Sequence, residues 1–178
     1  MLRILMRLWR TIDVTRLADT VQPFADAASV VVGEGFTRSA KTAGLYYLTT
    51  RPSGITTVEV PEVFPQPAEV NAARLRGAGL AGILNARRAG FSPQAAAQNG
   101  FVKVAGTASR LVLDGGRQTI LQTAVQDPAA SGRWQRIAGP NACEFCQMLA
   151  DRGPVYSDDT ADFSSHDHCG CSASPEFT

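Results

Sequence analysis

The sequence lacks any apolar run that is long enough to cross a membrane. Its mostly apolar stretches are interrupted by charges or glycines well before the roughly 20 residues that a membrane-spanning helix requires. The N-terminal segment MLRILMRLWR is a poor signal peptide, because Arg3, Arg7 and Arg10 are interleaved with apolar residues instead of preceding an apolar core. We therefore expect no membrane contact, and we interpret this segment as an amphipathic or partner-binding start.

The short motifs of common enzyme classes are also missing. There is no phosphate-binding glycine loop, no Gly-x-Ser-x-Gly nucleophile elbow and no His-Glu-x2-His metalloprotease motif. A zinc deaminase would need His-x-Glu together with Pro-Cys-x2-Cys, whereas this chain has HDH and NACEFC. We therefore expect that the protein is not an enzyme.

Positive charge is not gathered into runs, and the two parts of the chain have opposite net charge. The whole chain carries a net charge of +1. Residues 1–142 hold 16 Lys and Arg against 9 Asp and Glu, a net of +7, whereas residues 143–178 hold one arginine against seven acids, a net of −6. The scattered arginines favour a solvated helical surface over a nucleic-acid-binding one.

Helical periodicity dominates the first 127 residues. Apolar residues recur at spacings of three to five between residues 13 and 51, which predicts a long helix. Pro23 is expected to kink or divide it, because proline lacks an amide hydrogen and clashes with the preceding turn, and Gly33 and Gly35 weaken it further. Residues 51–67 contain four prolines and a β-branched run, which predicts an extended connector with room for one edge strand.

Two further helices are predicted after this connector. One spans residues 68–89 and is ended by Gly90. The next begins with Ser92 as N-cap and Pro93 at the first helical position. A break is expected at Gly115 and Gly116, after which RQTILQTAVQ resumes the helix. Elongated helices with modest apolar stripes suggest an assembly surface, although a plain helical bundle fits the same pattern.

The sequence changes character from residue 131. The segment RWQRIA has strand character, and the turn GPN leads into a short helix, with Asn141 as expected N-cap and Glu144 as its capping-box partner. Gly153 and Pro154 close that helix, VYS is a second short strand, and CGCSASPEF is a last extended piece. The fold class predicted is mainly α, with an elongated helical docking region over residues 1–130 and a small α+β module over residues 131–178.

All four cysteines and both histidines lie in the last 36 residues. Cys143 and Cys146 share a face in the first turn of the short helix, where free amides and the helix dipole favour thiolate. His166, Cys169 and Cys171 follow after a 19-residue loop. This spacing is typical of a structural zinc site, in which four thiolate or imidazole ligands hold a segment that is too small to bury a core.

Six side chains compete for four ligand positions. The favoured set is Cys143, Cys146, His166 and one of Cys169 or Cys171, with His168 outside the ligand shell; in an extended strand Cys169 and Cys171 point to the same face. Disulfide bonds are an alternative to a metal site, and four cysteines allow three pairings. A thioredoxin-type redox Cys-x2-Cys is less well supported, because it needs a preceding βαβ unit.

The C-terminal segment WQRIAGPNACEFCQMLADRGPVYSDDTADFSSHDHCGCSASPEF resembles the C-terminal domain of MuF-like minor head proteins of tailed phages, particularly those of actinobacteriophages. That family's pattern has a Cys-x2-Cys, a glycine followed by a hydrophobic-aromatic pair, and a closing His-x2-Cys-x-Cys motif. The matching residues are Cys143 and Cys146, Gly153 with Val155 and Tyr156, and His166, Cys169 and Cys171.

This resemblance implies a structural component of the virion. Such a protein is made in the host cytoplasm and is present in several copies at the portal or inside the capsid, where it acts in head assembly or DNA delivery. Its implied partners are the portal protein, the major capsid protein, or both, and it has no established catalytic activity. The alternative function is a zinc-containing nucleic-acid-binding protein that contacts packaged DNA through arginines before residue 142.

Overall fold

A computed structural model describes residues 1–52, 57–157 and 162–178. It confirms the predicted fold class, a mainly helical chain with a small C-terminal sheet. The elements are α1 (Leu2–Trp9), α2 (Leu17–Thr50), α3 (Ala68–Arg88), α4 (Pro93–Gln126), β1 (Ala130–Ile137), α5 (Glu144–Ala150) and β2 (Ser172–Phe177).

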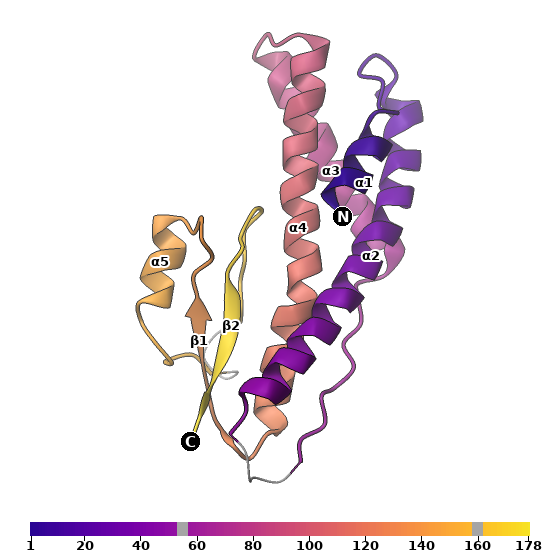
Figure 1. Ribbon diagram of the computed structural model, residues 1–178. Helices are drawn as coiled ribbons and strands as arrows, with labels where there is room; N and C mark the ends of the chain where they lie inside the picture. The colour runs from indigo at the N-terminus through magenta and orange to yellow at the C-terminus, as the bar shows by residue number, and fades with distance from the viewer. Residues whose placement is uncertain (53–56, 158–161) are drawn as a thin grey trace.

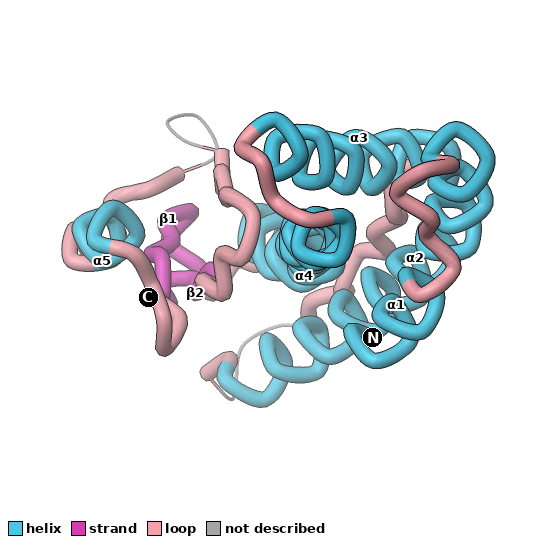
Figure 2. Tube along the Cα trace, turned by 90° about the horizontal axis from the view of Figure 1, so that it is seen from above, coloured by secondary structure: helices cyan, strands magenta, loops and turns pink. Residues whose placement is uncertain are grey.

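The long helices form an elongated bundle. α2 and α4 each have 34 residues, which corresponds to a length of about 50 Å. They run in the same direction, and α3, which follows α2 and precedes α4 in the chain, runs in the opposite one (Figure 1). Viewed from above, α4 lies between the other helices on one side and the small sheet on the other, with α5 outermost (Figure 2). α4 therefore supports both parts of the molecule.

The N-terminal helix α1 packs into the bundle core. Leu5 and Trp9 are buried, and the indole Nε1 of Trp9 donates to the carbonyl oxygen of Ala97 at 3.0 Å. The Trp9 ring meets Phe24 edge to face, with ring centroids 4.9 Å apart. The amphipathic interpretation of this segment is confirmed, and its buried face contacts the rest of the chain. None of the described helices is both long enough and apolar enough to span a membrane.

Most helix boundaries agree with the signals in the sequence. The Ser92 hydroxyl accepts a hydrogen bond from the amide of Ala95 at 3.2 Å, as expected of an N-cap. Gly90 has φ +83° directly after α3, a conformation that favours glycine and ends a helix.

The helical region differs from the sequence-based expectations in two places, and one predicted strand lies partly outside the described residues. Of the two effects expected of Pro23, division of the helix does not occur, because α2 is continuous from Leu17 to Thr50. Gly115 and Gly116 lie inside α4, which continues to Gln126. Residues 57–67 contain no strand, and the remainder of the predicted edge strand, residues 53–56, lies outside the described residues.

The two glycines in α4 allow α2 to approach closely. A Cβ added at Gly115 would lie 2.4 Å from the backbone oxygen of Phe36. At the next residue, the amide of Gly116 donates to the Ser39 hydroxyl at 3.2 Å. The sequence suggested a helix break because glycine lowers helix propensity. Tertiary packing outweighs that cost, since the missing side chains create the helix contact.

Replacing Gly115 by alanine is therefore expected to destabilise the bundle by roughly 1–3 kcal/mol, although alanine is the better helix former. Urea unfolding followed by far-UV circular dichroism measures the change. Gly77→Ala in α3 is the matched control, because no atom lies within 4 Å of a Cβ at that site. A gain in stability at both sites would contradict the proposed close contact.

The C-terminal module is built on an antiparallel pair of strands. Trp134 pairs with Pro175 and Arg136 with Ala173, and both β1 side chains are buried because alternate residues share one face. Tyr156, in the predicted strand VYS, forms only an isolated bridge with Trp134, while their rings stack with centroids 4.7 Å apart. Strand formation at RWQRIA is confirmed, and of the extended piece CGCSASPEF the residues Ser172–Phe177 form a strand, whereas Cys169 and Cys171 lie before it.

A buried ion pair joins the end of α2 to the turn between α4 and β1. Asp127, between α4 and β1, receives two hydrogen bonds of 2.7 Å from Arg51 at the end of α2. It also accepts from the Tyr47 hydroxyl at 3.1 Å and from the amide of Ala129 at 2.9 Å. The Arg51 hydrogen bonds are the largest influence that lowers the pKa of Asp127, and they outweigh the effect of burial.

Asp127→Asn is expected to lower the free energy of unfolding by about 3 kcal/mol, because it removes the carboxylate that accepts two hydrogen bonds from the largely buried guanidinium of Arg51. The folded-state pKa of Asp127 lies below its unfolded value. Its contribution is therefore present above about pH 4 and is lost as the pH falls further.

Urea titrations at pH 7 and pH 3 check both statements. The variant should differ strongly from the unaltered chain at pH 7 and much less at pH 3. Asp19→Asn is the control, since the Arg16–Asp19 pair is exposed and is expected to contribute less than about 1 kcal/mol. An equal loss at both pH values would contradict the ionic role of Asp127.

Candidate metal centre

The first two candidate ligands lie at the start of α5. Cys143 is the N-cap of this helix and Cys146 lies in its first turn. The prediction that Asn141 caps the helix was wrong by two residues, because Cys143 is the N-cap and makes no side-chain capping hydrogen bond. Cys143 is thus both the residue at which the helix begins and a candidate metal ligand. Its place one turn before Cys146 holds the two thiols next to each other.

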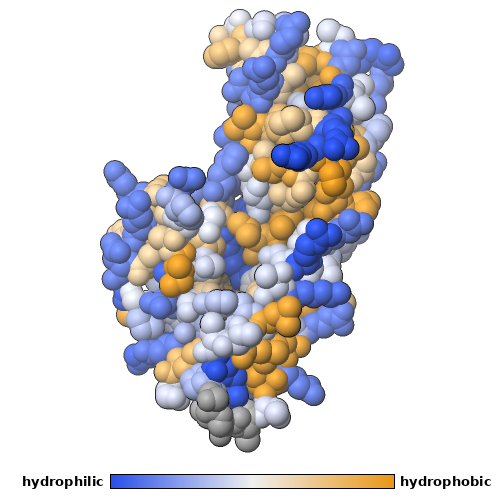
Figure 3. Space-filling model, in the orientation of Figure 1, coloured by the Kyte–Doolittle hydropathy of each residue, from blue (hydrophilic) through white to orange (hydrophobic). Residues whose placement is uncertain are grey.

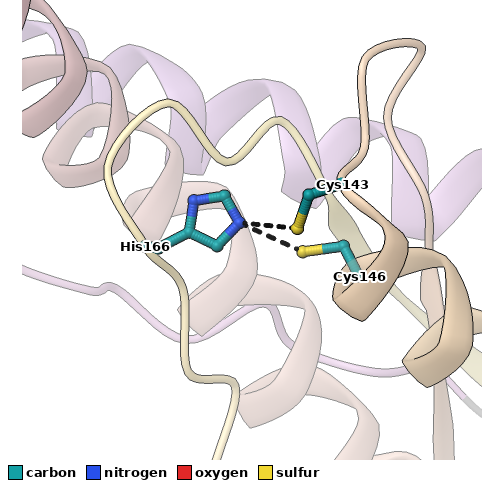
Figure 4. Close-up of side chains that lie close together, drawn as sticks. All are labelled: Cys143, Cys146 and His166. Carbon is teal, nitrogen blue, oxygen red and sulfur yellow. Dashed lines mark hydrogen bonds between the residues drawn. The ribbon is translucent and has the colours of Figure 1, made fainter.

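His166 brings the third ligand from the loop before β2 (Figure 4). Its Nε2 lies 3.4 Å from the Sγ of Cys143 and 3.3 Å from the Sγ of Cys146. Its Nδ1 lies 2.7 Å from the carbonyl oxygen of Asp167. A carbonyl only accepts hydrogen bonds, so Nδ1 carries a proton, and in the neutral imidazole the lone pair of Nε2 then faces the two sulfurs. This is the tautomer that a metal ligand needs.

Cys169 and Cys171 complete the cluster from its buried side. The Sγ atoms of Cys146 and Cys169 are 4.0 Å apart. Two triads, Cys143–Cys146–His166 and Cys146–Cys169–Cys171, each have all ligand atoms within 4.8 Å of one another. Cys146 belongs to both triads. The structure therefore gathers all five predicted ligands around one buried thiol.

The distances fit tetrahedral coordination. Zinc–sulfur bonds near 2.3 Å and zinc–nitrogen bonds near 2.0 Å give tetrahedral edges of about 3.8 Å between sulfurs and about 3.5 Å between sulfur and nitrogen. The observed contacts of 4.0, 3.4 and 3.3 Å lie close to these edges. All four cysteines are free thiols, and 4.0 Å is far longer than a sulfur–sulfur bond of about 2.05 Å. The arrangement matches a metal site and not a disulfide.

His168 lies outside both triads. Its backbone has φ +65°, and its ring packs against Gly106 of α4, where an added Cβ would lie 2.5 Å from Nε2. His168 therefore contacts the long helix, while His166 two residues earlier faces the thiols.

The pKa values of the thiols are shifted in different directions. The amide of Cys146 and the side chain of His166 lower the pKa of Cys143 to about 7. Burial, followed by the neighbouring thiols, raises the pKa of Cys146 to about 12. Asp167 and Cys143 together raise the pKa of His166. Burial alone would raise the pKa of Cys171, but the Gly139 amide, the neighbouring thiols and Arg136 lower it overall. A coordinated dication deprotonates its thiol ligands. It would therefore offset the cost of forming a buried thiolate at Cys146.

Sequence reasoning missed the residue that anchors this site, Arg117 of α4. Its guanidinium is buried and donates to the carbonyl oxygens of Cys169 at 2.8 Å and of Cys171 at 2.8 and 3.0 Å. It also pairs with Asp114 at 2.7 Å and donates to the Ser165 hydroxyl at 3.0 Å. The Cys-x-Cys segment is thereby fixed to the long helix. The segment GGRQ gave no signal of this role, because a helical arginine is normally exposed.

These observations define a class of protein: an elongated helical protein whose small C-terminal α+β module is built around a cysteine and histidine cluster suited to a metal ion. A family model described as VG15 protein matches residues 1–178, and the chain therefore belongs to the VG15 protein family. This is a family of viral gene products, which indicates a phage protein. No curated protein and no solved structure matches the chain.

Proposed function

We propose that the protein is a structural component of a phage virion, a MuF-like minor head protein that binds the portal or the inside of the capsid. The observation that carries this proposal is the assembly of Cys-x2-Cys and His-x2-Cys-x-Cys into one cluster, in a chain whose whole length matches a viral protein family. In this proposal the protein acts in head assembly or DNA delivery and performs no catalysis.

The proposed metal is zinc, with a structural role. Thiolate and imidazole donors at near-tetrahedral distances are the ligands that structural zinc prefers. A 48-residue module with two strands and one short helix buries too little apolar surface to be stable alone. Cys143, Cys146 and His166 would hold the ion together with Cys169 or Cys171, and binding would supply folding free energy to the module.

Exposed apolar side chains support a role in an assembly. Leu45 and Leu48 near the end of α2 are 68% and 48% exposed, and Phe64 in the connector beside them is 69% exposed. These residues border a common groove. On the face shown in Figure 3, apolar surface extends over several helices between patches of charged side chains. Such surfaces are often covered by a partner.

The virion itself provides the test. Purified particles, separated heads and separated tails are analysed by quantitative mass spectrometry for this chain, and localised reconstruction is used to search the portal vertex. We expect several copies per particle, in the head fraction and at or near the portal. Absence from purified heads would overturn the proposal.

A gel-shift series at increasing salt tests the DNA-binding alternative. The C-terminal module has a net negative charge, so DNA contact would depend on arginines before residue 142. The affinity for DNA would then fall steeply as the salt concentration rises. DNA that is retarded at low salt and released as the salt rises would favour that function, and no retardation at low salt would remove it.

A further inference from the structure

Arg136 of β1 is a buried cation without an acidic partner among the described residues. Its residue exposure is 4%. Its Nη2 donates to the carbonyl oxygen of Ser164 at 2.7 Å, while its Nη1 is buried with no acceptor. None of the ion pairs between described residues includes it. A buried guanidinium without a counter-charge is strongly unfavourable, so we expect a negative charge near Arg136.

The cysteine cluster is the group that Arg136 faces. The Arg136 side chain lies beside the thiol of Cys171. It also borders, with Cys146 and His166, a pocket of about 270 Å³. The ring of Phe163 lies 4.0 Å from its guanidinium carbon and 4.9 Å from that of Arg117. The two arginines thus flank one aromatic ring, which packs against the cysteine cluster.

The two buried arginines differ in how their charges are balanced. Arg117 has a carboxylate partner, Asp114, at 2.7 Å, and its other donors reach carbonyl oxygens. That pair is close to neutral as a unit. Among the residues that the structure describes, Arg136 therefore contributes one positive charge without a carboxylate partner at the edge of the cluster.

We propose that Arg136 is the built-in counter-ion of an anionic metal–thiolate centre. The proposal rests on the zinc site proposed above. A zinc ion with three thiolates and one neutral imidazole carries a net charge of about −1, whereas four thiolates would give about −2. One guanidinium without a carboxylate partner among the described residues matches the first composition. The charge balance thus favours three cysteines and His166 as the ligands.

The physical consequence is a dependence of metal affinity on the charge at position 136. Inside the protein, the attraction between a guanidinium and an anionic centre is much less screened than at the surface. Residues next to the ligand shell typically change metal affinity by about 10- to 100-fold when they are replaced.

The experiment compares Arg136→Gln with Arg136→Lys in the full-length chain. Glutamine keeps a donor for the Ser164 carbonyl but removes the charge, whereas lysine keeps the charge. Free zinc is set with chelator buffers, and the zinc midpoint is read from Trp134 fluorescence in a Trp9→Phe background. This midpoint can be measured even where the module folds only with metal. Arg133→Gln on the same strand is the control, since Arg133 is exposed.

We expect Arg136→Gln to raise the zinc midpoint by roughly 10- to 100-fold and Arg136→Lys to remain close to the unaltered chain. The Arg133→Gln midpoint should change by less than about twofold, because an exposed charge is screened. The glutamine effect should persist at high salt.

Equal midpoints for the glutamine and lysine variants would overturn the counter-ion role and assign Arg136 to packing. A change of less than about threefold in Arg136→Gln would also overturn it. If the unaltered chain shows no zinc-dependent transition and binds no zinc, the metal site itself fails, and this inference fails with it.

Discussion

Cys146→Ser is expected to unfold the C-terminal module while the long helices remain folded. Cys146 belongs to both ligand triads and is 2% exposed, so its loss removes the thiol that connects all other ligands. Apparent free energies of structural zinc binding are about 10–16 kcal/mol. A module of this size has no comparable source of stability, so a large fraction of that energy is also its folding energy. Chelation of the metal is expected to have the same effect.

The two tryptophans allow the two parts of the molecule to be followed separately. Trp9 lies in the helical core and Trp134 lies in the module. In a Trp9→Phe background, Cys146→Ser should shift Trp134 emission to longer wavelength, while far-UV circular dichroism retains most of its helical signal.

His168→Asn is the matched control for loss of a nearby candidate ligand. Asparagine tolerates the positive φ of this residue, and His168 lies outside both triads. This variant should keep its metal and its buried Trp134. A Cys146→Ser protein with unchanged Trp134 emission would contradict a stabilising role for the metal.

Arg117→Met is expected to detach the module from α4 and to cost about 3–5 kcal/mol, even with metal bound. The substitution leaves the carbonyl oxygens of Cys169 and Cys171 and the carboxylate of Asp114 without their donor. Buried acceptors without a partner cost about 1–3 kcal/mol each. Lysine should not restore the stability, because it cannot reproduce the planar fork of the guanidinium.

Hydrogen exchange followed by mass spectrometry measures this effect along the chain. Exchange should accelerate in β1, β2 and the Cys-x-Cys segment, with little change in α3. Arg110→Met is the control on the same helix, because the Arg110–Asp167 pair is partly exposed and should contribute less than about 1 kcal/mol. Similar exchange in both variants would show that Arg117 does not anchor the module.

The sequence predicted the fold class because its strongest signals are local. Helical periodicity, the Ser92-Pro93 start and the turn at Gly90 act within a few residues, and the structure agrees with each of them. The break predicted at Gly115 failed because its glycine serves a contact with Phe36, which lies almost 80 residues earlier in the chain. No local pattern reports that a helix must approach another so closely.

In the candidate site, too, the residues of a local motif could be predicted, whereas residues that are buried by contacts distant in sequence could not. Cys143, Cys146, His166, Cys169 and Cys171 were recognisable because few residue types bind soft metals and their spacing is regular. Arg117 and Arg136 were not recognisable, since their burial results from packing of α4 against the sheet. Arginine carries no sequence mark that separates a buried counter-ion from a solvated surface charge.

The most direct test of the central claim is the metal content of the purified full-length chain, measured by native mass spectrometry and elemental analysis after expression without chelators. The account predicts one zinc per chain, lost together with the buried environment of Trp134 when a strong chelator is added. A metal-free chain with four free thiols and a fully folded C-terminal module would contradict it.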